Sequence, residues 1–121
     1  MTSLTMALAA LLSRPVAASA RARAAQHVLD WLGCACIGAE SPAGRAFART
    51  GARLGAGPCR AIGVGDLDAH GAAFVNGAYG NVLEMDDIHR TSILHPGPVV
   101  IPAALAAAQL LEVDADGFLD A

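Results

Sequence analysis

The sequence predicts an all-α fold with at most a short extended segment near residues 59–65. Apolar residues recur at helical spacing in the first half of the chain. Capping residues, glycines and prolines divide the chain into pieces of helical length. Alanine fills 28 of the 121 positions, and its high helix propensity and small side chain favour closely packed helices.

The first predicted helix runs from about residue 16 to residue 37. Pro15 suits the first turn of a helix, and Ser13 is a candidate N-terminal cap. Five residues at helical spacing form its apolar side: Val28, Leu29, Leu32, Ala35 and Cys36. Gly38 follows them and is the predicted end of this helix.

A second, shorter helix is predicted to begin near Ser41-Pro42 and to end at about Leu54. Serine before proline is a common start of a helix. The residues that break it are Gly55, Gly57 and Pro58. The short extended segment over residues 59–65 comes next.

The third predicted helix covers residues 69–83, with Asp66 or Asp68 as its N-terminal cap. Its small residues are Gly71, Ala72, Ala73, Gly77, Ala78 and Gly80. Glycines lower the intrinsic helicity of this segment, so we expect it to be stabilised by tight packing against its neighbours.

A fourth helix is predicted from about Pro98 to Leu111, and its sequence carries no charged residue. Asp114 is the predicted cap of a fifth helix that begins at Ala115. The sequence ends one or two turns into that helix. We therefore expect the chain to be one portion, residues 1–121, of a larger helical domain.

The composition argues against several classes of protein. The formal net charge is −3 and lysine is absent, whereas nucleic-acid binders carry a basic excess. Three cysteines are too few for a disulfide scaffold, and unpaired thiols suit a reducing compartment. We therefore expect a cytoplasmic protein that does not bind nucleic acid.

Two segments resemble membrane or export signals without meeting their requirements. Residues 1–12 are apolar, but no positive residue precedes them and Ser3 and Thr5 interrupt them. Residues 93–111 carry no Asp, Glu, Lys or Arg, yet they include a histidine and three prolines. We therefore expect no membrane association.

Chemically active side chains concentrate in residues 84–97, called the polar segment below. It contains Glu84, Asp86, Asp87, His89, Arg90 and His95 between two nearly charge-free helices. Charged groups beside so much apolar sequence are costly unless they are paired or exposed. Carboxylates next to histidines can transfer protons near neutral pH, as acid/base catalysis requires.

Three interpretations of the polar segment remain open from its residue types alone. It is a solvated loop whose carboxylates cap helix ends, or a metal-free acid/base site, or a metal site. The ligands of a metal site would be Asp86, Asp87, His89 and His95. Their spacing matches no recognised metal motif.

Other features of the sequence favour structural roles. Residues 63–65 lack the third glycine of a dinucleotide-binding loop. Cys34 and Cys36 point to different sides of a helix, so core packing explains them better than a shared metal. His27 is interpreted as a partly buried structural residue, and Ser92 has no nucleophile-elbow motif around it.

Four runs of sequence together resemble the MmgE/PrpD family. They are Leu29–Cys34, Asn76–Asp87, Leu94–Gly97 and Val100–Ala106. The second resembles the family's N-G-A-x-x-H-x-L-D-F-D-D-T pattern, the third its H-P-[SG] element, and the fourth its V-x-P-A-A-L-A helix. The resemblance extends over nearly the whole chain from about Pro15.

This resemblance implies the N-terminal part of the family's large helical domain. It also implies a carbon–oxygen lyase or a related enzyme, such as a dehydratase, decarboxylase or epimerase. The implied substrate is a small di- or tricarboxylate, the implied cofactor and metal requirement is none, and the implied assembly is a homodimer.

The family's site residues are carried over where the motifs match. His95 corresponds to the histidine of the H-P element and becomes a candidate general acid or base. The catalytic acids implied by the L-D-F-D-D element are Glu84, Asp86 and Asp87. The candidate substrate-binding residues are Asn76, which lies in the matched N-G-A run, and His89 and Arg90, which compensate where the sequence departs from the family. Arg90 is suited to hold a carboxylate through two hydrogen bonds.

The sequence also departs from the family pattern. Glu84 replaces the usual aspartate, Met85 the usual aromatic residue and Ile88 the usual threonine. Family members are several times longer and supply further catalytic residues, including lysine, from a second domain. We therefore expect a partner, either a second copy or a complementing C-terminal polypeptide. The alternative is a truncated, non-catalytic module that pairs with another chain through its apolar surface.

Overall fold

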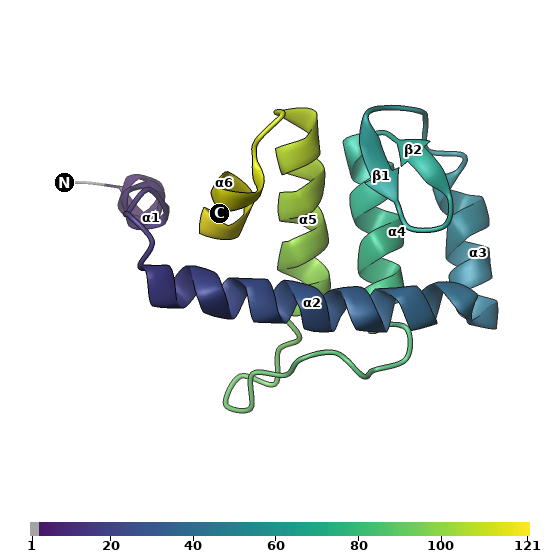
Figure 1. The fold of residues 1–121 in the computed structure, drawn as a ribbon, viewed down its shortest axis with the longest axis horizontal. Coiled ribbons are helices and arrows are strands. Elements are labelled where there is room, and N and C mark those ends of the chain that lie inside the picture. The colour runs from purple at the N-terminus through teal and green to yellow at the C-terminus, as the bar shows by residue number, and fades with distance from the viewer. Residues whose placement is uncertain (1–2) are drawn as a thin grey trace.

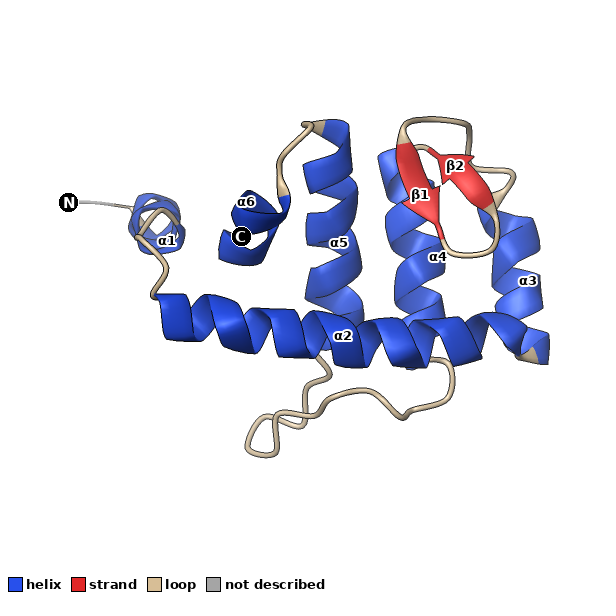
Figure 2. Ribbon diagram, in the orientation of Figure 1, coloured by secondary structure: helices blue, strands red, loops and turns tan. Residues whose placement is uncertain are grey.

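The computed structural model describes residues 3–121 and confirms the predicted all-α class (Figures 1 and 2). Within these residues the chain forms six helices and one two-stranded sheet. In chain order they are α1 Leu4–Leu12, α2 Ala18–Glu40, α3 Pro42–Gly51, β1 Cys59–Ala61, β2 Gly65–Leu67, α4 Ala69–Asn81, α5 Gly97–Leu110 and α6 Ala115–Asp120.

The long helix α2 packs against α3, α4, α5 and α6. Helices α3, α4 and α5 lie side by side across one side of α2, and the loop between α4 and α5 extends on the opposite side (Figure 1). Helix α4 is central, because it packs against α2, α3, α5 and both strands. Its buried residues Val75 and Tyr79 meet Trp31 and Ala35 of α2 in the core.

The predicted end of the first long helix at Gly38 is wrong, because α2 continues to Glu40. Gly38 instead allows close packing: a Cβ there would collide with the backbone carbonyl of Tyr79. The chain turns at Ser41, whose hydroxyl donates to the Gly38 carbonyl at 2.7 Å and accepts from the Gly44 N–H at 2.8 Å. Ser41 therefore caps α3, as predicted.

We predict opposite effects for two alanine substitutions in α2. Gly38→Ala should lower the free energy of unfolding by about 1–3 kcal/mol, because the new methyl group must displace the α4 backbone. Gly33→Ala, in the same helix but with open space around its Cα, should raise it by about 0.5–1 kcal/mol. Urea unfolding followed by circular dichroism measures both. Equal effects of the two substitutions would refute the close-packing role of Gly38.

The extended segment near residues 59–65 is confirmed in part. Residues 59–61 form β1, which pairs antiparallel with β2, a return strand that the sequence did not reveal. Asp66 lies in β2, so Asp68 is the cap of α4, accepting the Gly71 N–H at 2.6 Å. Asn76 of α4 holds β1: its amide donates to the Arg60 carbonyl and accepts the Ile62 N–H, both at 2.9 Å.

The two ends of the described chain differ in how they pack. Ser13 closes α1 rather than capping α2, and Pro15 lies in the connection, so both predictions for the start of α2 are wrong. Every residue of α1 is exposed. In contrast, α6, capped by Asp114 as predicted, packs on α2 and α5. The first two residues of the apolar N-terminal segment lie outside the described residues.

A bidentate ion pair joins helix α6 to α2. Arg21 donates from Nε and Nη2 to the two carboxylate oxygens of Asp120, at 2.7 and 2.5 Å. The hydrogen bond from Arg21 and the arginine charge lower the pKa of Asp120 from its ordinary value of 3.8, against a smaller opposing effect of desolvation.

This lowered pKa predicts a pH-dependent contribution to stability. A carboxyl group whose pKa is lower in the folded state stabilises the fold above its unfolded value and loses that contribution as the pH falls through the folded value. Asp120→Asn should therefore lower the melting temperature at pH 7, and this difference should shrink as the pH falls below 3.8. Asp116→Asn is the control, because Asp116 lies 3.8 Å from Arg21 and is largely exposed. A pH-independent effect of Asp120→Asn would contradict the assignment.

No helix among residues 3–121 is long and apolar enough to cross a membrane.

Candidate functional site

The polar segment, residues 84–97, joins α4 to α5 and is irregular up to the start of α5 (Figure 2). His89 and Leu94 form a short bridge within it, with the His89 N–H donating to the Leu94 carbonyl at 2.8 Å. Glu84 and Ile93 adopt positive φ angles of 49° and 54°, which turn the chain sharply. This path brings the second half of the segment back against its first half.

The central feature of the segment is the pair formed by the buried Asp86 and the partly exposed His95. His95 Nδ1 lies 2.8 Å from Asp86 Oδ2, and the Asp86 side chain is 1% exposed. The Asn81 amide donates to the other oxygen at 3.4 Å. Because a carboxylate only accepts, Nδ1 of His95 carries the proton and Nε2 is the free basic atom. The carboxylate therefore fixes both the orientation and the tautomer of the imidazole.

His95 lines a hollow of about 340 Å³, called the His95 pocket. The other residues that line it are Phe74, Gly77, Ala78, Asn81, Pro98 and Val99, from α4 and α5. The imidazole is one-third exposed, whereas its carboxylate partner is buried. This combination of a buried orienting acid and an accessible imidazole is suited to moving protons to and from a bound molecule.

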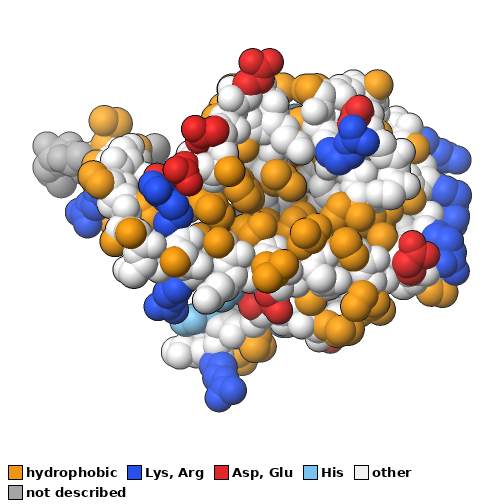
Figure 3. All heavy atoms as spheres, in the orientation of Figure 1, with side chains coloured by type: hydrophobic (Ala, Val, Ile, Leu, Met, Phe, Trp, Pro, Cys, Tyr) orange, Lys and Arg blue, Asp and Glu red, His pale blue; other side chains and the backbone are white. Residues whose placement is uncertain are grey.

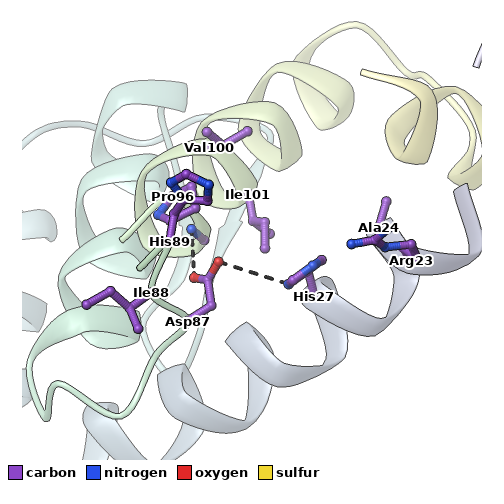
Figure 4. Close-up of a pocket in the computed structure, with 10 residues that line it drawn as sticks. Arg23, Ala24, His27, Asp87, Ile88, His89, Pro96, Val100 and Ile101 are labelled. Carbon is purple, nitrogen blue, oxygen red and sulfur yellow. Dashed lines mark hydrogen bonds and ion pairs between the residues drawn. The ribbon is translucent and has the colours of Figure 1, made fainter. Parts of the chain in front are cut away.

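Asp87, which follows Asp86 in the sequence, forms no hydrogen bond with His95 and binds the start of α5 instead. Its Oδ1 accepts the Gly97 N–H at 2.9 Å, at the first turn of α5 (Figure 4). A Cβ on Gly97 would collide with this oxygen, so a larger residue there would have to displace the Asp87 side chain. A carboxylate at a helix N-terminus also interacts favourably with the helix dipole. Asp87 thereby holds the end of the polar segment against α5.

A second hollow, of about 460 Å³, lies between α2, the polar segment and the start of α5, and is called the Arg23 pocket (Figure 4). The residues that line it are Arg23, Ala24, His27, Asp87, Ile88, His89, Pro96, Gly97, Val100 and Ile101. His27 points from α2 toward Asp87, with Nδ1 at 4.0 Å from Oδ2 (Figure 4). The neighbouring carboxylates Asp86 and Asp87 thus face different histidines.

The remaining predicted site residues lie apart from the Asp86–His95 pair, in different surroundings. Glu84 and Arg90 are exposed, and neither makes an ion pair within residues 3–121. His89 lines the Arg23 pocket, and its Nδ1 lies 2.6 Å from Ser92 Oγ. Asn76 is 1% exposed and its amide holds β1, so we assign it a structural role.

Sequence reasoning missed the role of α2 in this region. His27 is not partly buried as expected, because its side chain is 55% exposed and lines the Arg23 pocket. The signal was present: Arg23 and His27 are four residues apart and therefore lie on one side of a helix. Ala24 between them, and Ala20 before them, leave room above that side.

Within residues 3–121, no group of three or more His, Cys, Asp and Glu side chains is arranged to hold a metal ion. The expected separation of Cys34 and Cys36 is confirmed, with the first buried and the second exposed. The prediction of core packing is therefore right for Cys34 and wrong for Cys36. Burial raises the pKa of the Cys34 thiol. Neither of these cysteines lines the two pockets.

Comparison with known proteins matches this chain to one family. Residues 3–121 match the MmgE/PrpD N-terminal domain. The cis-aconitate decarboxylase of Aspergillus terreus is 36% identical over 91 residues, which cover 74% of this chain. The protein of the same description from A. terreus strain NIH 2624 / FGSC A1156 gives the same values. The aligned region is about a fifth, 19%, of the length of these relatives. No solved structure gives a significant match.

Proposed function

Because the chain belongs to the MmgE/PrpD family, we propose that it forms part of a lyase that acts on a small di- or tricarboxylate by acid/base proton transfer. The Asp86–His95 pair is the observation that carries this proposal. It couples a buried carboxylate to an imidazole that borders a pocket. No other histidine within residues 3–121 has a carboxylate at hydrogen-bond distance.

In the proposed mechanism, His95 Nε2 exchanges a proton with the carbon beside a substrate carboxylate. In a dehydration it takes that proton, the bond from the neighbouring carbon to the hydroxyl breaks, and the hydroxyl leaves as water with a proton from a second acid. In a decarboxylation a C–C bond breaks, carbon dioxide leaves, and His95 delivers a proton to the carbon. The negative charge of Asp86 stabilises the imidazolium in either case.

The other candidate residues belong to the same polar segment as this pair. Glu84, at the exposed start of the polar segment, is the proposed second acid, and Asp87 positions the segment by its bond to Gly97. Arg90 and His89 are the proposed partners of substrate carboxylates, with Arg90 able to form two parallel hydrogen bonds. These steps use side chains alone, and the proposal includes no cofactor or metal.

The proposed assembly is a homodimer or a complex with a complementing C-terminal polypeptide, which would close the open side of the His95 pocket. We place this activity in the cytoplasm, since Cys34, Cys36 and Cys59 are all unpaired thiols. Cis-aconitate, named in the description of the A. terreus relative, is the first substrate to test. The test is the conversion of cis-aconitate by this chain mixed with such a polypeptide. The unmodified chain is compared with a His95→Ala variant.

A second candidate function is a non-catalytic assembly module. Hydrophobic side chains gather over the middle of α2 on the face shown in Figure 3. Leu29 is 71% exposed, and Leu32 and Ile37 are exposed on the same helix. Apolar surface of this kind is typical of a binding face. Analytical ultracentrifugation separates the candidates, because a monomer that binds no partner polypeptide argues against the assembly module.

A further inference from the structure

We infer that the Arg23 pocket binds a small aliphatic monocarboxylate. The pocket is built by α2, the polar segment and the first turn of α5, and its volume of about 460 Å³ is within the range of small-molecule sites (Figure 4). Neither His95 nor Asp86 lines it. The pocket shares His89 and Asp87 with the residues named for the proposed lyase function, but its cation, Arg23, has no part in that function. The inference can therefore fail or succeed separately.

The cation for a carboxylate is Arg23. Its guanidinium is exposed and makes no ion pair within residues 3–121, whereas Arg21, two residues before it, is paired with Asp120. A free guanidinium at the rim of a hollow is suited to two parallel hydrogen bonds with a carboxylate. His27 lies one turn further along α2, beside the same hollow (Figure 4).

The body of the ligand would be apolar. Most of the side chains between the polar groups are aliphatic: Ala24, Ile88, Pro96, Val100 and Ile101. Val100 is exposed on α5 although it borders the pocket, so a hydrocarbon chain lying against it would remove apolar surface from water. These aliphatic side chains favour a ligand with an aliphatic chain over a sugar or a nucleotide.

Asp87 restricts the ligand to a single negative charge. One of its oxygens is occupied by the Gly97 N–H, and the other faces His27 across 4.0 Å inside the pocket (Figure 4). A second carboxylate at that end of a ligand would meet this negative charge. The Arg23 pocket thus prefers a ligand with one carboxylate, whereas the substrate of the proposed lyase site carries two or three.

The test is a titration of the full chain with hexanoate, followed by NMR of the histidine imidazole signals. The chain supplies its own controls, since His27 and His89 line the pocket while His70 and His95 do not. We expect saturable shifts of the His27 and His89 signals only. Hexan-1-ol, which lacks the charge, and adipate, which carries a second one, should both bind at least about tenfold more weakly.

Two variants complete the test. Arg23→Gln should weaken hexanoate binding about tenfold, while Arg49→Gln, an exposed arginine on α3, should leave it unchanged. The inference is overturned if hexanoate produces no saturable shift, if all four histidines shift alike, if hexan-1-ol or adipate binds as tightly as hexanoate, or if the two arginine variants bind equally.

Discussion

Replacing His95 with alanine is expected to lower the turnover of cis-aconitate about 10²- to 10⁴-fold, the usual contribution of a positioned acid/base group. The substitution removes the imidazole that borders the His95 pocket and leaves Asp86 without its partner. Turnover is measured by carbon dioxide release from the chain mixed with a complementing C-terminal polypeptide. Circular dichroism establishes that the variant remains folded.

His70→Ala is the matched control for this experiment. His70 is exposed on the first turn of α4 and makes no ion pair in the described part of the chain, so its removal should leave turnover unchanged. If His95→Ala retained the turnover of the unmodified chain, the proposed acid/base role would be wrong. Equal losses in both variants would indicate a general effect of losing a histidine.

Replacing Asp86 with asparagine is expected to lower turnover on the order of 10²-fold, because the histidine loses the charge that stabilises its protonated form. Asparagine has nearly the shape of aspartate and still offers an oxygen to Nδ1, so the fold should persist. We expect kcat to fall while KM changes little, since Asp86 is buried behind His95 and does not line the His95 pocket. Asp66→Asn, an exposed aspartate in β2, is the control.

A double-mutant cycle distinguishes positioning from structural support. If Asp86 acts only through His95, then Asp86→Asn should have no further effect on turnover once His95 is alanine. Additive losses would mean that Asp86 contributes to the fold or the site by another route. The cycle therefore tests the pair rather than either residue alone.

Helices α3 and α6 were predictable because their start signals are local, whereas α1 was not predicted and the start of α2 was predicted wrongly. Ser41 and Asp114 cap helices that begin with the next residue, and each cap depends on hydrogen bonds within three residues. Gly38 misled the prediction because its role is tertiary: it makes room for the α4 backbone. Only the β1 strand of the hairpin was predicted, also for a tertiary reason. Asn76, which is distant in the sequence, holds β1 in place.

The candidate site was predictable in its residues but not in its connections. The polar segment supplied the right chemical groups, and the family resemblance pointed to His95. Spacing alone does not show that Asp86 turns toward His95 while Asp87 turns toward Gly97 and His27. That division depends on how the loop folds back and on the position of α2 beside it.

The exposure of α1 has a consequence for cooperativity. A nine-residue helix is marginal in water when no other part of the protein supports it. Since no residue of α1 is buried, its helix–coil equilibrium is governed by its own sequence and the Ser3 cap rather than by the core of Trp31 and Tyr79. We therefore expect α1 to fray without affecting the packed body from α2 to α6.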